Sequence, residues 1–170
     1  MKRTLLAAPA LLLIVGSAWA VLAPQARTTE DKILSRFVGK WEIEGKHMKA
    51  PMKGSAEYTW ALGKKFLKGD GRITSGDGSF AYESTIYIRP TEKEGHYSIV
   101  WLDNLGSIIN STMVADGNKL TMEWMEKTPL GDHPAKSEIT LLDDGWTDKS
   151  MGKINDAWVE FGTVTFKRSK

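Results

Sequence analysis

The sequence predicts an all-β fold, an up-and-down antiparallel β-barrel of about ten strands, and three observations lead to that prediction. From Lys40 onward apolar and polar residues alternate with a period of two, which is the pattern of half-buried strands. Nine clusters rich in Gly, Pro, Asn and Asp divide this region into ten strand-length segments. The connections are short, so consecutive strands should pair antiparallel. Closure into a barrel would remove the exposed edges of such a meander.

The N-terminus has the order of parts of a secretory signal peptide. Lys2 and Arg3 precede an apolar stretch over residues 5–15, and Ala18-Trp19-Ala20 has the small-x-small form that signal peptidase cleaves. We assign residues 1–20 to a signal peptide, with cleavage after Ala23 as the alternative. An uncleaved anchor is the competing interpretation, because about 20 apolar residues can span a bilayer. Cleavage is favoured, and the mature protein is expected to be periplasmic or extracellular, without a stable membrane anchor.

Removal of this leader would leave the chain without net charge. The chain has 23 Lys and Arg against 21 Asp and Glu, and the excess of two equals the contribution of Lys2 and Arg3. A neutral domain lacks the electrostatic attraction that favours nucleic acid or anionic membranes. Cysteine is absent, so an exported domain of this sequence must be stabilised by its core alone. We expect no nucleic-acid partner.

Residues 21–39 precede the barrel, and their second half, residues 28–39, is expected to form one short helix. Thr28 or Thr29 can cap the first free N–H groups, and Gly39 ends the segment. Its apolar residues fall on one face, which is predicted to cover the closed end of the barrel: Ile33, Leu34 and Phe37.

Residues 40–170 are assigned to a single barrel domain. Barrel diameter grows with strand number, and ten strands are expected to leave a cavity. Alternation along the strands predicts which side chains point inward: Ala56, Tyr58, Trp60, Leu62, Phe80, Tyr82, Ser84, Ile86, Ile88, Leu120, Met122, Trp124, Trp158, Glu160, Gly162, Val164 and Phe166.

A Gly-x-Trp sequence, Gly39-Lys40-Trp41, stands where the helix meets the first strand, and Lys167 and Arg168 end the last strand. These features resemble the calycin superfamily, the lipocalins and fatty-acid-binding proteins, and the stretch 87–106 is similar to bacterial lipocalin-like domains of unknown function. The resemblance implies that Trp41 packs at the closed end beneath a C-terminal basic residue. The Arg-x-Tyr carboxylate clamp of fatty-acid-binding proteins is missing from residues 164–168, so the resemblance does not extend to fatty acids.

If Trp41 marks the closed end, every odd-to-even connection lies at the open end. His47 shares the parity of Trp41 and lies about 20 Å further along the strand, at the mouth. His133, in the loop expected over residues 128–134, is predicted to lie at the same end. The predicted ligand-binding residues are aromatic or polar side chains of the wall and mouth: His47, Tyr58, Trp60, Tyr82, Trp101, Trp124, Trp158 and Glu160.

The favoured function is non-enzymatic binding of a small apolar or aromatic molecule, with no cofactor. One alternative is an enzyme for a small hydrophobic substrate that uses a histidine or Glu160, whose pKa burial would raise. Another is a haem-binding barrel with His47 or His133 as axial ligand. A third is a structural or interaction module with a filled interior. Two histidines without a third ligand do not indicate a metal site, and the sequence leaves the oligomeric state open.

Overall fold

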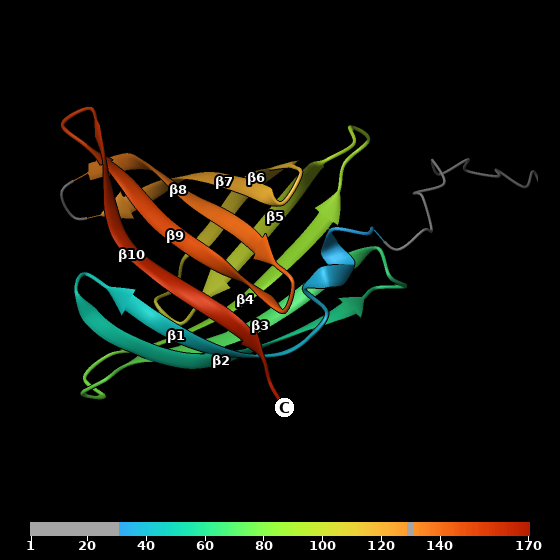
Figure 1. The fold of residues 1–170 in the computed structure, drawn as a ribbon. Helices are drawn as coiled ribbons and strands as arrows, with labels where there is room; N and C mark the ends of the chain where they lie inside the picture. The colour runs from blue at the N-terminus through green and yellow to red at the C-terminus, as the bar shows by residue number, and fades with distance from the viewer. Residues whose placement is uncertain (1–30, 129–130) are drawn as a thin grey trace, which may run out of the picture.

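The structure is a computed structural model that describes residues 31–128 and 131–170, and these form a closed barrel of ten antiparallel strands (Figure 1). The predicted signal peptide, residues 1–20, lies outside the described residues. The strands follow one another as β1 Gly39–His47, β2 Ala50–Ala61, β3 Phe66–Ser75, β4 Ala81–Pro90, β5 His96–Asp103, β6 Ile108–Asp116, β7 Lys119–Thr128, β8 Gly131–Leu142, β9 Gly145–Ile154 and β10 Ala157–Arg168.

Each strand pairs with its neighbours in sequence, and β10 closes the barrel on β1. The closing register runs from Trp41 opposite Arg168 to His47 opposite Gly162. The turn after β1 has both central residues at positive φ, Met48 at 48° and Lys49 at 72°. This left-handed pair matches the twist of a tight hairpin, so the turn holds β1 and β2 in register. The predicted all-β, up-and-down barrel is confirmed.

The predicted N-terminal helix is wrong in its extent within the described residues. Only one 3-10 turn forms there, η1 (Leu34–Arg36), and it lies at the end of the barrel away from the β1–β2 turn (Figure 1). Asp31 caps it, because its Oδ1 accepts hydrogen bonds of 2.9 Å from the N–H groups of Ile33 and Leu34. The expected caps, Thr28 and Thr29, lie outside the described residues. No helix in the described part of the chain is long and apolar enough to span a membrane.

An aromatic cluster fills the closed end of the barrel. The ring of Trp146 lies 4.5 Å from that of Trp41, 4.7 Å from Phe37 and 4.4 Å from Phe166, measured between centroids. Leu34 and Phe37 are 0% and 4% exposed, so the N-terminal turn covers this end as predicted. Aromatic pairs in such tilted and stacked arrangements stabilise a core beyond their buried area. The cluster therefore closes the barrel interior at this end, and it is called the aromatic floor below.

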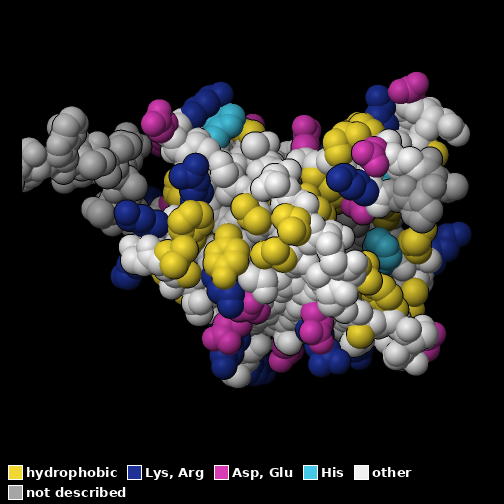
Figure 2. All heavy atoms as spheres, turned by 180° about the vertical axis from the view of Figure 1, so that it is seen from behind, with side chains coloured by type: hydrophobic (Ala, Val, Ile, Leu, Met, Phe, Trp, Pro, Cys, Tyr) yellow, Lys and Arg dark blue, Asp and Glu magenta, His cyan; other side chains and the backbone are white. Residues whose placement is uncertain are grey.

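The outer surface carries an apolar patch over β5 and β6, and the view from behind shows hydrophobic side chains gathered among charged ones (Figure 2). Val100, Leu102 and Ile108 contribute to the exposed apolar surface of these strands. They alternate with inward residues such as Ile99 and Trp101, so these strands are apolar on both faces. This explains why their orientation could not be predicted from periodicity.

Candidate ligand-binding cavity

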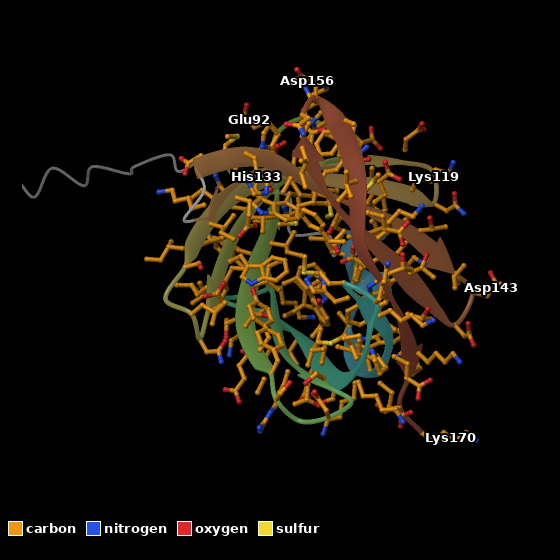
Figure 3. The ribbon with its side chains drawn as sticks, turned by 90° about the vertical axis from the view of Figure 1, so that its left-hand side faces the viewer. Glu92, Lys119, His133, Asp143, Asp156 and Lys170 are labelled. Carbon is orange, nitrogen blue, oxygen red and sulfur yellow. The ribbon has the colours of Figure 1, made fainter. Side chains whose placement is uncertain are left out.

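A cavity of about 560 Å³ lies inside the barrel above the aromatic floor. Its wall is mostly apolar, with isoleucines and methionines of β3 to β8 among aromatic rings. Met48, Phe80 and Leu105, from three loops of the predicted open end, line it and remain exposed, so the cavity reaches the mouth. Figure 3 looks toward this end, where many side chains project into the lumen. The alternative of a filled interior is wrong.

Five of the eight predicted site residues line this cavity: His47, Tyr58, Tyr82, Trp101 and Trp124. They come from strands β1, β2, β4, β5 and β7, so the barrel brings together side chains that are far apart in sequence. The inward orientation predicted for His47, Tyr58, Tyr82 and Trp124 agrees with the structure. Trp101, whose orientation the alternation left open, also points inward. Their role in binding a ligand stays a prediction.

Trp60 also has the predicted parity, but it packs against the buried core rather than lining the cavity. It lies on β2 opposite Leu67 of β3, a residue with no exposed surface. Leu62, two residues further along, was expected to point inward and instead lies in the β2–β3 turn with φ of 49° and 69% exposure. The inward alternation of β2 therefore ends at Trp60.

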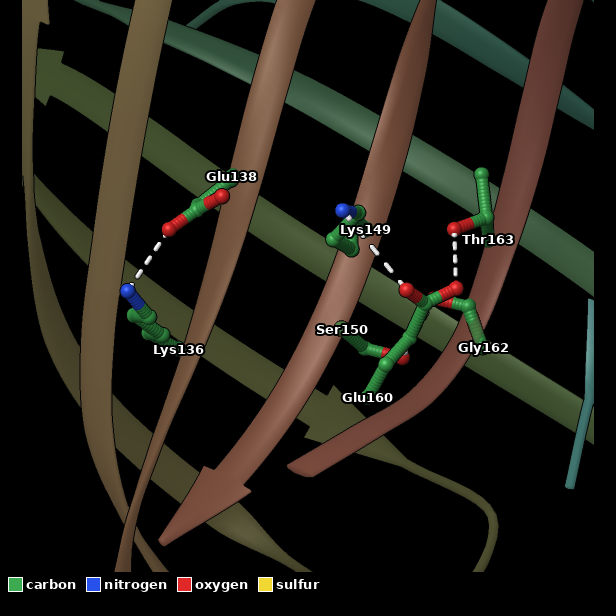
Figure 4. Close-up of polar contacts among 7 residues, drawn as sticks. All are labelled: Lys136, Glu138, Lys149, Ser150, Glu160, Gly162 and Thr163. Carbon is green, nitrogen blue, oxygen red and sulfur yellow. Dashed lines mark hydrogen bonds and ion pairs between the residues drawn. The ribbon is translucent and has the colours of Figure 1, made fainter. Parts of the chain in front are cut away.

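The predicted inward orientation of Trp158 and Glu160 is wrong. A β-bulge shifts the β9–β10 register between Glu160 and Gly162, and the extra residue reverses the parity of everything before it. Glu160 consequently lies on the outer face, where Oε2 is 3.6 Å from Lys149 Nζ and Oε1 accepts a 2.8 Å hydrogen bond from Thr163 (Figure 4). Trp158 also lies outside, with Lys136 Nζ 4.7 Å from its ring centroid.

The bulge brings Phe161 into the cavity in place of Glu160. The Phe161 carbonyl accepts a 2.6 Å hydrogen bond from the Met48 N–H, which ties the bulge to the β1–β2 turn at the mouth. The sequence analysis did not identify Phe161 as a site residue. No alternation signal could have revealed it, because a bulge breaks the period on which such reasoning depends.

Both predicted mouth histidines line the cavity. His47 lies on β1 beside Gly162, and burial lowers the pKa of its imidazole. His133, labelled in Figure 3, lies on β8 near Gly152. The loop expected over residues 128–134 is shorter than predicted, because β7 runs to Thr128 and β8 begins at Gly131. No group of three or more His, Asp or Glu side chains within residues 31–128 and 131–170 is placed to hold a metal ion.

Polar contacts fix two aromatic rings of the upper wall. The Tyr82 hydroxyl donates a 3.1 Å hydrogen bond to Asp103 Oδ2, and burial together with this carboxylate raises the pKa of the phenol. Trp124 Nε1 donates a 2.6 Å hydrogen bond to Glu126, which also lines the cavity. Rings held in this way present a rigid apolar surface to a ligand.

Besides Glu126, the cavity lining contains a second carboxyl group that was not predicted from the sequence, Asp148. Asp148 lies on β9 between Trp146 and Ser150, and all three line the cavity. Burial raises the pKa of Asp148 to about 6, although a hydrogen bond from Ser137 opposes the shift. The Asp148 charge and burial together raise the pKa of Tyr58. The alternation from Trp146 was an available signal, but β9 is polar on both faces and does not display which one is buried.

A second hollow, about 790 Å³, lies against the barrel wall but opens widely to solvent. Several charged side chains line it: Arg72 Nε lies 3.4 Å from Glu83, and Asp70 accepts a 2.8 Å hydrogen bond from Thr85. A ligand there would remain largely hydrated. The enclosed apolar cavity is therefore the better candidate for a ligand site.

No protein-family model matches the chain. No curated protein matches it either. Among solved structures, the chain is similar to a redesigned β-barrel, mFAP1, bound to DFHBI, with 13% identity, a TM-score of 0.44, and coverage of 81% of this chain and 100% of that one. It is also similar to EF1p2_mFAP2b bound to DFHBI, with 10% identity, a TM-score of 0.47, and coverage of 83% and 100%.

Proposed function

We propose that this protein binds a small apolar or aromatic molecule inside its barrel without catalysing a reaction. The observation that carries the proposal is the cavity of about 560 Å³, which is walled by aromatic and aliphatic side chains and reaches the mouth. Small-molecule sites commonly measure about 300–1,000 Å³ and combine an apolar wall with a few polar groups. Tyr58, Tyr82 and His47 supply such groups here. Burial of the ligand's apolar surface would provide most of the affinity.

The position of Glu160 supports the non-enzymatic part of the proposal. This residue was the sequence-based candidate for acid or base chemistry in the cavity, and it lies outside, 3.6 Å from Lys149. A solvated, paired carboxylate has no access to a molecule in the lumen. Of the groups that the enzymatic alternative named, Glu160 is thus excluded, and the histidines of the cavity remain.

We also propose that the chain is a calycin-like barrel. Trp41 is buried at the closed end, two residues after Gly39 at the start of β1, and Arg168 of the last strand lies over its ring. This arrangement agrees with what the Gly-x-Trp resemblance implied. The short N-terminal turn covering the same end is consistent with it.

Export to the periplasm or the cell exterior is a further part of the proposal, and it is supported by the order of basic, apolar and small residues in positions 1–20. Expression of the full chain in a bacterial host, followed by mass measurement of the protein in periplasm and medium, tests it. Release of a product that begins at Val21 or Pro24 is expected. A full-length product that stays with the membrane would contradict export with cleavage.

The binding function is tested on protein purified from its own host. Native mass spectrometry should detect a retained small molecule, and denaturation should release it. Titration of the emptied protein with the neutral fluorescent probe N-phenyl-1-naphthylamine should then give saturable binding. A protein that carries nothing and does not bind the probe would refute the proposal. A Soret absorption band that is lost in His47→Ala or in His133→Ala would instead identify a haem protein.

A further inference from the structure

Two buried polar atoms have no hydrogen-bond partner within the described residues, and both belong to side chains that line the cavity: Asp148 Oδ1 and Trp101 Nε1. Buried polar atoms in folded proteins are nearly always paired, so an unpaired one calls for an explanation. The two lie on β9 and β5, which are separated by β8, β7 and β6 around the barrel wall. The side chains of Asp148 and Trp101 therefore line the cavity on well-separated parts of the wall.

The surroundings of Asp148 supply no countercharge. Its neighbours across the sheet are Ile139 on β8 and Val164 on β10, and no lysine or arginine of the described chain forms an ion pair with it. Ser137 provides a hydrogen bond to the carboxyl, but Oδ1 remains without a donor. Leaving a buried carboxylate unpaired is costly, and an apolar residue at this position would avoid the cost.

Trp101 presents the complementary group. Its indole N–H can only donate, and it lies beside the Tyr82 hydroxyl, which donates to Asp103 and whose oxygen can still accept from the indole. The other tryptophan of the upper wall, Trp124, does donate to a protein group, Glu126.

We infer that Asp148 is the polar anchor of the cavity and that the preferred ligand is an aromatic or apolar molecule carrying an amine or amidinium group that donates to this carboxylate. The inference rests on the proposed binding function and specifies its ligand class. A cation both neutralises the carboxylate and fills the missing donor position, and charge-assisted hydrogen bonds are the strong ones. The other fully charged side chains of the lining are Lys46 and Glu126, one of each sign.

The titration of Asp148 gives the inference a pH signature. Burial raises its pKa to about 6, so the empty site is largely ionised at about pH 7.5 and largely protonated at about pH 5. Other titratable groups also line the cavity and must be separated from it: Lys46, His47, Tyr58, Tyr82, Glu126 and His133. The Asp148→Asn variant isolates the contribution of Asp148, because all the others remain in place.

The experiment compares three naphthalene probes of nearly equal size by isothermal titration calorimetry at about pH 7.5: 2-naphthylmethylamine, 2-naphthylmethanol and 2-naphthoate. The wild-type protein should bind the amine about 10- to 100-fold more tightly than the alcohol, the range expected for a hydrogen bond to a charged group. Naphthoate should bind most weakly. Asp148→Asn should remove the preference for the amine and leave the affinity for the alcohol within about threefold.

Glu160→Gln is the matched control, since it makes the same carboxyl-to-amide change on the outer face of the neighbouring strand and should leave all three affinities unchanged. The amine preference of the wild type should also decline as the pH falls from about 7.5 to about 5, whereas Asp148→Asn should show no such decline. An amine preference that persists in Asp148→Asn, or equal wild-type affinities for amine and alcohol, would overturn the inference while leaving the binding function intact. Failure of all three probes and of N-phenyl-1-naphthylamine would refute the binding function itself.

Discussion

The guanidinium of Arg168 lies 4.4 Å from the centroid of the Trp41 ring, and its Nη1 donates a 3.2 Å hydrogen bond to the Val38 carbonyl. These contacts join the last strand to the chain that enters the first strand. Trp41 Nε1 in turn donates a 2.7 Å hydrogen bond to the Phe37 carbonyl, so a second polar contact fixes the ring. The closing seam of the barrel therefore depends on residues at both ends of the described chain.

Arg168→Ala should lower the free energy of unfolding by about 1 kcal/mol, because it removes a cation–π contact and an exposed hydrogen bond. Lys167→Ala is the matched control: Lys167 is the adjacent exposed residue and is expected to change stability by less than about 0.5 kcal/mol. Urea denaturation followed by tryptophan fluorescence measures both. Equal effects of the two substitutions would contradict a specific role for Arg168.

Two glycines of β3 that line the cavity should respond oppositely to alanine. A Cβ at Gly69 would lie 2.3 Å from the Tyr58 ring, whereas one at Gly71 would meet nothing closer than 3.7 Å. Gly69→Ala should therefore destabilise the protein by about 1–3 kcal/mol through overpacking. Gly71→Ala should be neutral or slightly stabilising, because it restricts the unfolded chain. Denaturation midpoints in urea compare the two, and equal losses would show that the Tyr58 ring is not held over Gly69.

The stability of the empty protein should depend on pH through the protonation of Asp148. The folded-state pKa of about 6 exceeds the ordinary value of 3.8, so between these pH values the folded protein retains a proton that the unfolded chain releases. Stability from this group is therefore lost as the pH rises from about 4 to about 6, and the loss is at most about 3 kcal/mol. Asp148→Asn lacks this loss.

The stability of Asp148→Asn relative to the wild type should accordingly increase from about pH 4 to about pH 6 and then level off. Urea denaturation of both proteins over this range measures the difference, in which the titrations of the other carboxylates cancel. A difference that does not vary with pH would contradict a raised pKa for Asp148.

Filling the cavity should abolish binding without disrupting the fold. Ser84 on β4 lines the cavity, and its neighbour Glu83 is exposed on the outer face. Ser84→Phe should reduce the affinity for N-phenyl-1-naphthylamine by at least about tenfold, because the added ring takes volume from the ligand. Glu83→Phe introduces the same ring outside and should leave binding unchanged. Loss of binding in Glu83→Phe alone would place the probe on the outer surface.

Most of the barrel could be predicted because its signals are local. Alternation along β2, β4 and β7 placed Tyr58, Tyr82 and Trp124 inward, and the turn residues marked where each strand ends. The helix prediction for residues 28–39 overestimated its length, because capping residues and an apolar face are compatible with a single turn as well as with three. Asp31, which caps that turn, also accepts a hydrogen bond from Tyr97 on β5, a contact that sequence spacing does not indicate.

The strand order and the inward faces of the regularly alternating strands could be predicted from the sequence alone, because a period of two and short turns leave few other topologies. The closed end at Trp41 was implied by the Gly-x-Trp resemblance and not by this pattern. Only the tertiary structure decided which carboxyl group is enclosed. One extra residue at Phe161 turns Glu160 outward to Lys149, and the pairing of β9 between β8 and β10 turns Asp148 inward. The position of a bulge and the choice of the buried face depend on the partner strands. A polar strand such as β9 therefore does not show which of its faces is buried until those partners are in place.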